Sequence, residues 1–298
     1  MKRIRWAIEL ALVICLALPF ALLPMKIALG AGRFIGLLLY LCWGSRRRIA
    51  TDNIEKAVAA GGLNIREPAS AIARKSFMHL GQSFVEIVKV YFGMGRRLID
   101  AIEPRGLENF YKAKEKGKGI LFITGHCGNW ELTALGFGAR GETISVIART
   151  QNNPYLNKLV EKARSRYGNR VIYKDNALMA VLSELRQNRI IGVLMDQAVI
   201  PEEGVVIDFL GRKAWTIKIP AIMARRLKPA VIPAFIHREG GRYIGTFYPE
   251  VQLSGETDPE KAVVEDTRIL SSYIENYIRE HPDEWLWIHR RWKRAPEA

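Results

Sequence analysis

The stretch Gly119-Ile-Leu-Phe-Ile-Thr-Gly-His126-Cys-Gly-Asn129-Trp-Glu131 decides the fold of this chain. Residues 120–124 form an apolar run typical of a buried strand, a turn with two glycines follows, and the residues after it predict a helix. Ligands in open α/β sheets bind beyond the carboxyl ends of the strands. The sequence therefore places His126 where a catalytic side chain is expected.

Predicted strands and helices alternate along the rest of the chain. Apolar runs predict further strands at 143–148, 170–173, 190–195, 230–236 and 243–248. Helices are expected at 129–138, 154–167, 176–188, 216–227 and 260–280, and the glycine pair at 240–241 predicts a hairpin. From 49 to about 91, apolar residues recur at three- and four-residue steps and predict helices. The expected fold class is α/β, with a mainly parallel mixed sheet flanked by helices.

The first 48 residues look like a membrane segment. After Lys2, Arg3 and Arg5, the run 6–24 is apolar apart from Glu9, close to the ~20 residues that cross a bilayer. A secretory signal peptide has a shorter apolar part, so we expect an uncleaved single anchor. The run 27–43 is expected either to lie at the membrane interface or to pack on the globular domain.

This pattern predicts the domain organisation and the orientation in the membrane. An N-terminal anchor with an interfacial helix (1–48) precedes a single larger domain (49–298), in which a helical lead-in (49–116) is followed by an α/β core (117–298). Basic residues are more numerous after the first apolar run than before it, which favours a cytoplasmic position for the C-terminal part.

The composition of the 298-residue chain is that of a globular protein. Hydrophobic residues make up 49% and charged residues 25%, which excludes wholesale disorder and low-complexity structure. The net charge of +15 points to anionic partners, such as phosphates, acidic lipids or an acidic carrier protein. A nucleic acid partner is not expected, because the basic residues are spread along the chain and form no recognised reading motif.

The three cysteines, Cys15, Cys42 and Cys127, form neither a disulfide framework nor a Cys-x-x-Cys metal site. This count suits a reducing compartment. The other potential metal ligands are scattered, so we expect no metal site and no cofactor.

His126 and Glu131 are five residues apart, a spacing that puts them on different faces of one continuous helix. They can meet if the histidine lies in the turn, which the glycines permit. A carboxylate on one ring nitrogen would leave the other to take a proton from a substrate hydroxyl. The alternative interpretation is a histidine that caps the helix and a surface glutamate in its first turn. Cys127 suggests a third interpretation, in which its thiol is a nucleophile activated by His126. Adjacent residues in an extended turn tend to point apart, which disfavours this interpretation.

The stretch around His126 resembles the His-x4-Asp/Glu motif of glycerolipid-type acyltransferases, and its surroundings resemble the lipid A biosynthesis acyltransferase family. The resemblance continues in order along most of the chain. Its other elements are Arg47-Arg48-Ile-Ala-Thr-Asp-Asn53, Arg149 before Asn152-Asn153-Pro154, Arg164-Ser-Arg166-Tyr-Gly168, Met195-Asp196-Gln197, Asp208-Phe-Leu-Gly-Arg212-Lys-Ala-Trp-Thr216 and His281-Pro-Asp-Glu-Trp285-Leu-Trp-Ile-His289-Arg-Arg-Trp292-Lys293.

The resemblance implies a glycerolipid acyltransferase-like fold and transfer of a fatty acyl chain from an acyl carrier protein thioester. The acceptor would be a hydroxyl of a lipid A precursor, a Kdo2-lipid IVA-like glycolipid, at the cytoplasmic side of the cell inner membrane. His126 would act as the general base with Glu131 as its partner. The tetrahedral oxyanion would need donors, such as the amides of the glycine turn or Arg164. An apolar groove for the acyl chain is also implied.

Several basic residues are candidates for substrate binding. Arg149, Arg164 and Arg166 suit phosphates and acidic sugars, because guanidinium groups bind such anions in a bidentate manner. For Arg166, a solvated helix face is an equal alternative. Arg212 and Lys213 follow a glycine in a predicted loop and are weaker candidates for contact with phosphate or with the carrier protein.

Asp196, Gln197 and Asn129 complete the set of candidate site residues. Asp196 and Gln197 end an apolar strand, where they would orient a substrate or brace the histidine turn, or simply cap a turn. Asn129 lies inside the central motif and is a candidate for substrate binding. The tryptophans of the C-terminal segment either form a membrane-interface belt or pack on the domain.

One departure from the family pattern, and the activity of related enzymes, leave alternatives open. Many members of the family carry a Phe-Pro-Glu element where this chain has Val58-Ala-Ala-Gly-Gly-Leu63. Related enzymes acylate mannosylated phosphatidylinositol from a coenzyme A thioester, so a different glycolipid or lysophospholipid acceptor is the alternative within enzymes. The alternative from another class is a non-catalytic basic protein that binds membranes, which would not need His126 or Glu131.

Overall fold

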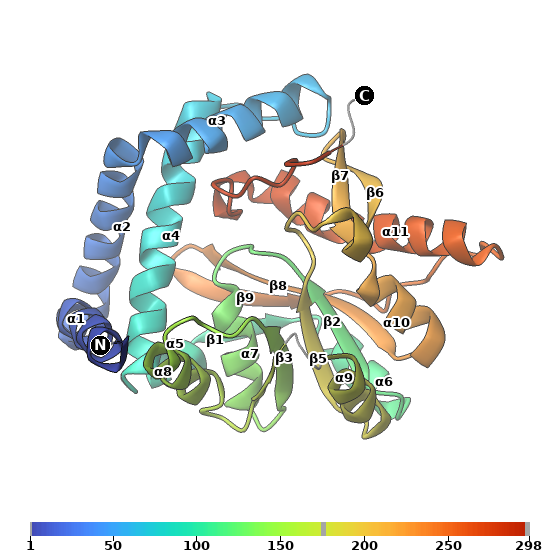
Figure 1. The fold of residues 1–298 in the computed structure, drawn as a ribbon, viewed down its shortest axis with the longest axis horizontal. Coiled ribbons are helices and arrows are strands. Elements are labelled where there is room, and N and C mark those ends of the chain that lie inside the picture. The colour runs from blue at the N-terminus through green and yellow to red at the C-terminus, as the bar shows by residue number, and fades with distance from the viewer. Residues whose placement is uncertain (1, 174–176, 296–298) are drawn as a thin grey trace.

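The computed structural model describes residues 2–173 and 177–295, whose central element is a mixed sheet with the strand order β1-β9-β8-β2-β5-β3-β4 (Figure 1). Neighbouring strands in it run parallel, except for the hairpin of β8 and β9 that the glycine pair predicts. The α/β class is therefore confirmed. The strands are β1 (Ile102–Arg105), β2 (Ile120–Thr124), β3 (Ile144–Ala148), β4 (Arg170–Tyr173), β5 (Ile190–Leu194), β8 (Ala230–Glu239) and β9 (Arg242–Phe247).

Helices cover both faces of the sheet, because the central strands are apolar on both sides. Successive side chains of β2 alternate between the faces. Ile120 and Phe122 join the apolar cluster of α6 (Leu107–Glu115) and α7 (Trp130–Gly138), whereas Leu121 and Ile123 join that of α11 (Pro259–Glu280). The other helices of the core are α8 (Pro154–Arg164), α9 (Ala177–Arg186) and α10 (Ile219–Leu227). Burial on both faces fixes β2, and with it the turn that follows.

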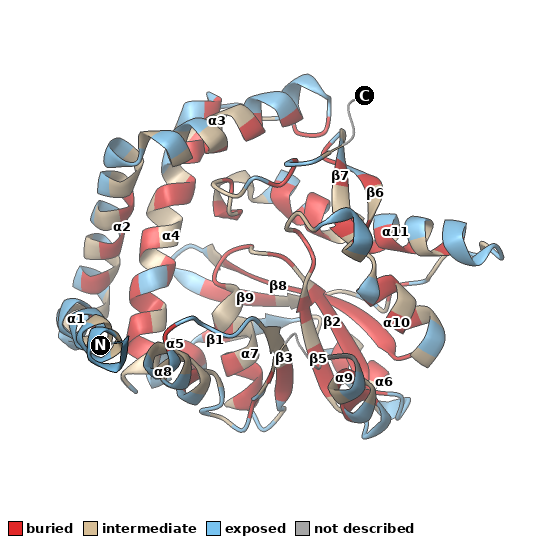
Figure 2. Cartoon of the chain, in the orientation of Figure 1, coloured by how far each residue is buried: buried red, intermediate tan, exposed pale blue. Residues whose placement is uncertain are grey.

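A helical arm precedes the core. α1 (Lys2–Leu22) and α2 (Met25–Cys42) are each long and apolar enough to cross a membrane, judged by length and composition alone. α3 (Gly44–Ala59), α4 (Ala69–Tyr91) and the short α5 (Arg96–Asp100) follow. In Figure 1, α2 runs alongside α4, and Figure 2 shows α4 buried over much of its length while α1 is largely exposed. α4 therefore lies between α2 and the rest of the molecule.

The helices α2 and α4 touch through their backbones. A Cβ atom added at Gly36 would lie 2.1 Å from the carbonyl oxygen of Phe77, and one added at Gly81 would lie 2.1 Å from that of Gly32. Small residues allow this close approach. One side of α2 thus packs on the protein, as the second of the two predictions for residues 27–43 requires. Phe34 and other large apolar side chains on the helix stay exposed.

α1 is tied to the rest of the protein near both of its ends. Close to its start, the Asn153 side chain at the beginning of α8 donates a hydrogen bond to Glu9 (2.9 Å). Close to its end, the Lys89 ammonium of α4 donates to the carbonyl of Ala21 (2.9 Å). The helix between these contacts therefore lies beside the folded domain along most of its length.

Residues 204–217 depart from the prediction. They form a separate hairpin of β6 (Gly204–Phe209) and β7 (Arg212–Ile217), so the helix expected from 216 begins only at Ile219. Leu210 and Gly211 both have positive φ (49° and 73°), as a two-residue hairpin turn requires. The strand β1 is not predicted from the sequence and interrupts the expected helical lead-in (49–116), in which α6 lies. The start of the predicted helix 176–188 lies outside the described residues.

The chain ends in a segment with little regular structure that crosses the molecule. It starts with the short 3-10 helix η3 (Pro282–Glu284), and we call residues 282–292 the C-terminal strap. Trp285, Trp287 and Trp292 expose 2%, 0% and 8% of their surface. These tryptophans therefore pack in the core, and the alternative of a membrane-interface belt is wrong.

Candidate active site

The turn between β2 and α7 carries His126. Gly128 has a φ of 54°, and a Cβ atom at this position would lie 1.9 Å from the carbonyl oxygen of Ile236 in β8. Only glycine combines a positive φ with such a close approach to another backbone. The turn is therefore held against β8, and it presents the imidazole with 18% of the side chain exposed.

Asp196 holds this imidazole, and the register of the sheet explains why. β2 and β5 are parallel neighbours in which Thr124 pairs with Leu194, so His126 and Asp196 lie at the same distance beyond their strand ends. One carboxylate oxygen of Asp196 is 2.8 Å from His126 Nδ1, and the other accepts the His126 backbone N–H at 2.9 Å. Of the roles predicted for Asp196, bracing the histidine turn is the one observed.

The charges of this pair stabilise each other. Burial raises the pKa of the Asp196 carboxyl, but the His126 charge and the hydrogen bonds outweigh burial and hold this pKa at about 2. For His126, burial lowers the pKa, yet the charge and hydrogen bond of Asp196 raise it above the usual value. Because a carboxylate only accepts, Nδ1 carries the proton, and Nε2 keeps a lone pair 3.1 Å from the Gln197 side-chain amide nitrogen.

Glu131 bonds Arg164 instead of the imidazole. Its carboxylate accepts two hydrogen bonds from the guanidinium, one of them from Nε at 3.0 Å. The predicted contact between Glu131 and His126 is thus replaced by the His126–Asp196 pair, since Glu131 lies in the first turn of α7 and faces α8. The negative charge of Glu131 still favours the protonated form of the nearby imidazole.

A cavity of about 880 Å³ opens beside the histidine turn. The Trp130 ring lies edge-on to the imidazole with a centroid distance of 4.9 Å, and it also lines the cavity. One part of the cavity wall is charged, because it is lined by Arg149, Arg164 and Glu131. The sheet supplies an apolar wall, formed by Phe122, Ile144, Val146, Gly192, Leu194 and Ala234. The cavity therefore combines an apolar interior with charged groups close to His126.

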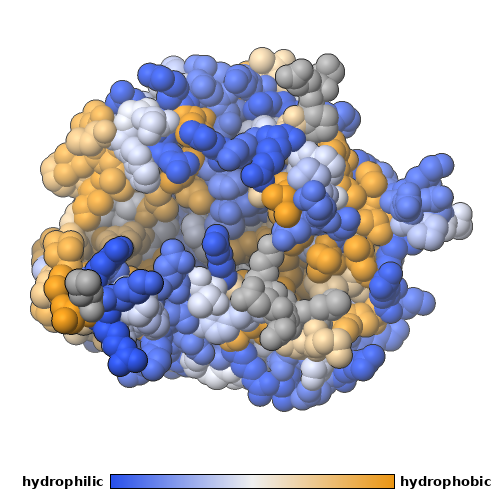
Figure 3. All heavy atoms as spheres, in the orientation of Figure 1, coloured by the Kyte–Doolittle hydropathy of each residue, from blue (hydrophilic) through white to orange (hydrophobic). Residues whose placement is uncertain are grey.

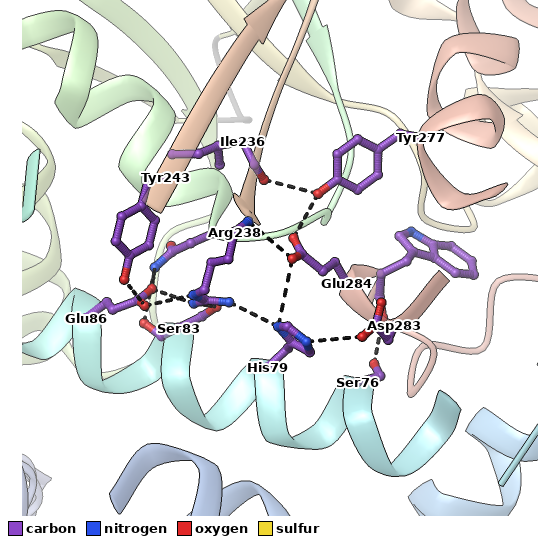
Figure 4. Close-up of polar contacts among 12 residues, drawn as sticks. Ser76, His79, Ser83, Glu86, Ile236, Arg238, Tyr243, Tyr277, Asp283 and Glu284 are labelled. Carbon is purple, nitrogen blue, oxygen red and sulfur yellow. Dashed lines mark hydrogen bonds and ion pairs between the residues drawn. The ribbon is translucent and has the colours of Figure 1, made fainter. Parts of the chain in front are cut away.

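Asn129 is not available to a substrate, contrary to the prediction. It is 97% buried, since 3% of its surface is exposed, and its amide donates to Glu86 at 2.6 Å. Glu86 in turn pairs with Arg238 and accepts the hydroxyl of Tyr243 (Figure 4). The residue thus fastens the start of α7 to a buried polar network instead of facing the cavity.

The remaining predicted arginines divide into two groups. Arg149 and Arg164 line the cavity, as substrate binding requires. Arg166 is exposed and lies outside the cavity lining, where its guanidinium reaches the carbonyl of Tyr91 at 3.4 Å. Arg212 lies on β7, also outside the lining, and stacks on Trp292 at 4.2 Å.

The structure disfavours the Cys127 alternative and two of the turn amides considered as oxyanion donors. Burial raises the pKa of the Cys127 thiol, which disfavours a thiolate nucleophile. The Gly128 amide donates to the carbonyl of Glu284 at 2.8 Å, and the His126 amide is bound to Asp196, so neither is free for an oxyanion. Arg164, the other predicted donor, lines the cavity.

The sequence does not indicate Trp285 as part of the site. Its indole N–H donates to the second oxygen of Asp196 at 2.8 Å, 89 positions away along the chain. No local pattern reveals such a contact, because it depends on where the strap crosses the sheet.

Comparison with known proteins identifies the family. The model of the family described as bacterial lipid A biosynthesis acyltransferase matches residues 2–294. The chain belongs to this family. It is 27% identical over 220 residues to a lipid A biosynthesis acyltransferase of Haemophilus influenzae, covering 70% of this chain and 67% of that protein.

Relatives with different acyl specificities also match. The lipid A biosynthesis lauroyltransferase of Escherichia coli is 24% identical, over 75% of this chain and 72% of its own length. The lipid A biosynthesis palmitoleoyltransferase of the same organism is 22% identical, over 92% of this chain and 87% of its own length. As a member of this family, the protein is a transferase of lipid A biosynthesis with a glycolipid acceptor.

The Asp196–His126 contact gives a first prediction. Replacing Asp196 by Asn removes the charge that stabilises the imidazolium, so the pKa of His126 should fall. The measurement is an NMR titration of the detergent-solubilised, histidine-labelled protein, with the His126 signal assigned by His126→Ala. Asp283→Asn is the matched control, because Asp283 pairs with His79 at 3.2 Å and should leave His126 unchanged. An unaltered His126 titration in Asp196→Asn would contradict the pairing.

Proposed function

We propose that this lipid A acyltransferase moves a fatty acyl chain from an acyl carrier protein thioester to a hydroxyl of a lipid A precursor, with His126 as the general base. The observation that supports this most directly is the oriented imidazole, whose Nδ1 is occupied by Asp196 and whose ring lies edge-on to Trp130, a residue of the cavity wall. A histidine in this state is suited to take a proton from a hydroxyl.

The proposed reaction needs no covalent enzyme intermediate. Nε2 of His126 takes the hydroxyl proton while the hydroxyl oxygen attacks the thioester carbonyl. The tetrahedral intermediate collapses, the carbon–sulfur bond breaks, and the imidazolium returns the proton to the departing thiolate. Asp196 stabilises the imidazolium through its charge, which the buried position strengthens.

Glu131 and Arg164 take part in this proposal as a pair. Glu131 orients the guanidinium and favours the imidazolium through its charge, and Arg164 faces the developing oxyanion. Gln197 lies next to Nε2, where its amide would orient the incoming hydroxyl. Arg149, exposed at the cavity, would bind a phosphate or acidic sugar of the acceptor.

The cavity beside His126 is proposed to hold the acyl chain. Its apolar part is formed by side chains of the central strands and lies next to Trp130. An acyl chain there would bring its thioester end toward the charged part of the wall. The net charge of +15 supports an acidic carrier protein as the donor.

The activity itself is the next prediction. The purified protein is given a tetra-acylated lipid A precursor with its acidic sugars, together with acyl carrier proteins loaded with chains of several lengths. We expect the mass of the precursor to increase by one acyl chain. His126→Ala should lower the rate by about 10²–10⁴-fold, the contribution typical of a general base. Mass spectrometry of the lipid product measures both.

Two outcomes would contradict this assignment. Full activity in His126→Ala would remove His126 from the mechanism. Transfer from coenzyme A thioesters, or to a phosphatidylinositol mannoside or lysophospholipid in place of the lipid A precursor, would replace the proposed donor or acceptor.

A substitution at Gly192 tests whether the acyl chain binds in this cavity. A Cβ atom there would lie 3.5 Å from Ile144 and 3.8 Å from Val146, both in the cavity wall, so a larger side chain fits only by entering the cavity. Gly192→Leu should therefore shift the preference of the enzyme toward shorter chains, with the longest accepted chain losing at least tenfold in rate. A competition assay with mixed acyl carrier proteins measures the ratio.

A neighbouring glycine supplies the control for this experiment. Gly136 lines a second cavity of about 490 Å³ between α6, α7 and the sheet. Gly136→Leu fills that space, and it should leave the chain-length preference unchanged. An equal shift in both variants, or none in Gly192→Leu, would exclude the first cavity as the acyl-chain site.

The proposed location is the cytoplasmic side of the inner membrane, with α1 and α2 in contact with lipid. Figure 3 shows the apolar surface that these helices present at the left edge of the molecule. Basic residues flank it, which suits anionic head groups. Because α1 is tied to Asn153 near its start and to Lys89 near its end, the contacts favour a helix that lies along the membrane surface over one that crosses it. The exposed apolar side chains include Ile4, Ile8, Leu12, Leu16, Leu22, Ile27, Phe34, Leu38 and Leu41.

The arrangement of α1 predicts the side of the membrane on which the N-terminus lies. Fusions of a fluorescent protein and of a periplasm-activated phosphatase to either end of the full chain should report a cytoplasmic position for both termini. A periplasmic N-terminus with a cytoplasmic C-terminus would show that α1 crosses the bilayer and leaves the contacts seen here.

A further inference from the structure

The C-terminal strap pairs with the histidine turn as a short antiparallel ladder. Cys127 and Trp285 form a β-bridge. On one side of it, the Gly128 amide donates to the carbonyl of Glu284 (2.8 Å), and on the other, the Leu286 amide donates to the carbonyl of His126 (3.2 Å). The backbone of the turn is therefore fixed by the strap as well as by its own strand.

The side chain of Trp285 reaches past the turn to Asp196. Its indole N–H donates to Oδ2 at 2.8 Å, while Oδ1 of the same carboxylate faces His126 Nδ1 at 2.8 Å. Asp196 has 1% of its surface exposed, so among the described contacts its oxygens are oriented by His126 and Trp285 alone. A carboxylate with a donor on each oxygen has one preferred rotamer.

The strap itself is held in place by the helical arm. The hydroxyl of Ser76 in α4 donates to the carbonyl of Trp285 at 2.7 Å. The residue before Trp285 is also held: Figure 4 shows Glu284 between the hydroxyl of Tyr277 and the backbone amide of Arg238. The strap is therefore anchored at both residues, and it cannot shift without breaking these contacts.

We propose that Trp285 is a positioning residue for the acyl transfer, one that holds the Asp196 carboxylate in the orientation that His126 needs. Trp285 touches neither the cavity nor a reacting atom, so it acts only through Asp196. This inference rests on the proposed role of His126 as the base.

The test is Trp285→Phe in the full-length enzyme, which keeps an aromatic ring in the core but removes the indole donor. Oδ2 of Asp196 then keeps only the His126 backbone amide as a donor, so the carboxylate is held less firmly. Its hydrogen bond to Nδ1 weakens and the burial of His126 counts for more, so the pKa of the imidazole falls. We expect kcat to fall about tenfold, the KM values for both substrates to stay within about twofold, and the acid limb of the kcat–pH profile to move to lower pH.

Trp287→Phe is the matched control. Trp287 is also in the strap, exposes 0% of its surface, and donates its indole N–H to the carbonyl of Pro282, away from Asp196. It should lose stability to a similar degree, measured by thermal unfolding, with an unchanged acid limb. An acid limb that stays in place or moves to higher pH in Trp285→Phe, or that moves equally in both variants, would overturn the positioning role.

A second variant keeps the inference testable if Trp285→Phe does not fold. Ser76→Ala frees the carbonyl of Trp285 without touching the indole, and it should move the acid limb in the same direction by a smaller amount. An unmoved limb would then overturn the proposal. Failure of the proposed function is distinguished separately, because only an active His126→Ala enzyme would remove His126 as the base.

Discussion

The buried carboxylate of Asp196 is the group on which the rest of the site depends. With 1% of its surface exposed, it keeps its charge only because donors replace the lost water. Two of them come from His126, and the third comes from Trp285. Each donor lies on a different segment from Asp196, so satisfying this one group forces β2, β5 and the C-terminal strap to meet at a single point.

The central part of this arrangement is predictable from sequence, because it is local. The apolar run 120–124, the glycine turn and the following helix appear as expected, and the glycine pair at 240–241 closes the hairpin of β8 and β9. These features depend on a few neighbouring residues and on backbone geometry. The hairpin of β6 and β7 is missed because its turn, Leu210-Gly211, places a leucine at positive φ, where sequence patterns do not suggest one.

The partner of His126 could not be predicted with the same certainty, because it depends on strand order. Glu131 is close in sequence, whereas Asp196 is 70 positions away and meets the imidazole only if β5 lies directly beside β2 in parallel register. The sequence pattern placed both Asp196 and His126 at the ends of apolar strands, and this was the available signal that the two residues are neighbours. It could not show which strands are neighbours, nor that Asn129 would turn inward to Glu86.

The contact between Ser76 and Trp285 closes a loop of 209 residues. Such long-range contacts form late, because the entropy of closing the loop is lost before the contact contributes stability. His126 and Asp196 are 70 positions apart, so the strand pairing that brings them together closes a much shorter loop. The two loop lengths therefore separate two contributions: the register of the sheet brings His126 and Asp196 together, and the strap adds the third donor to the carboxylate.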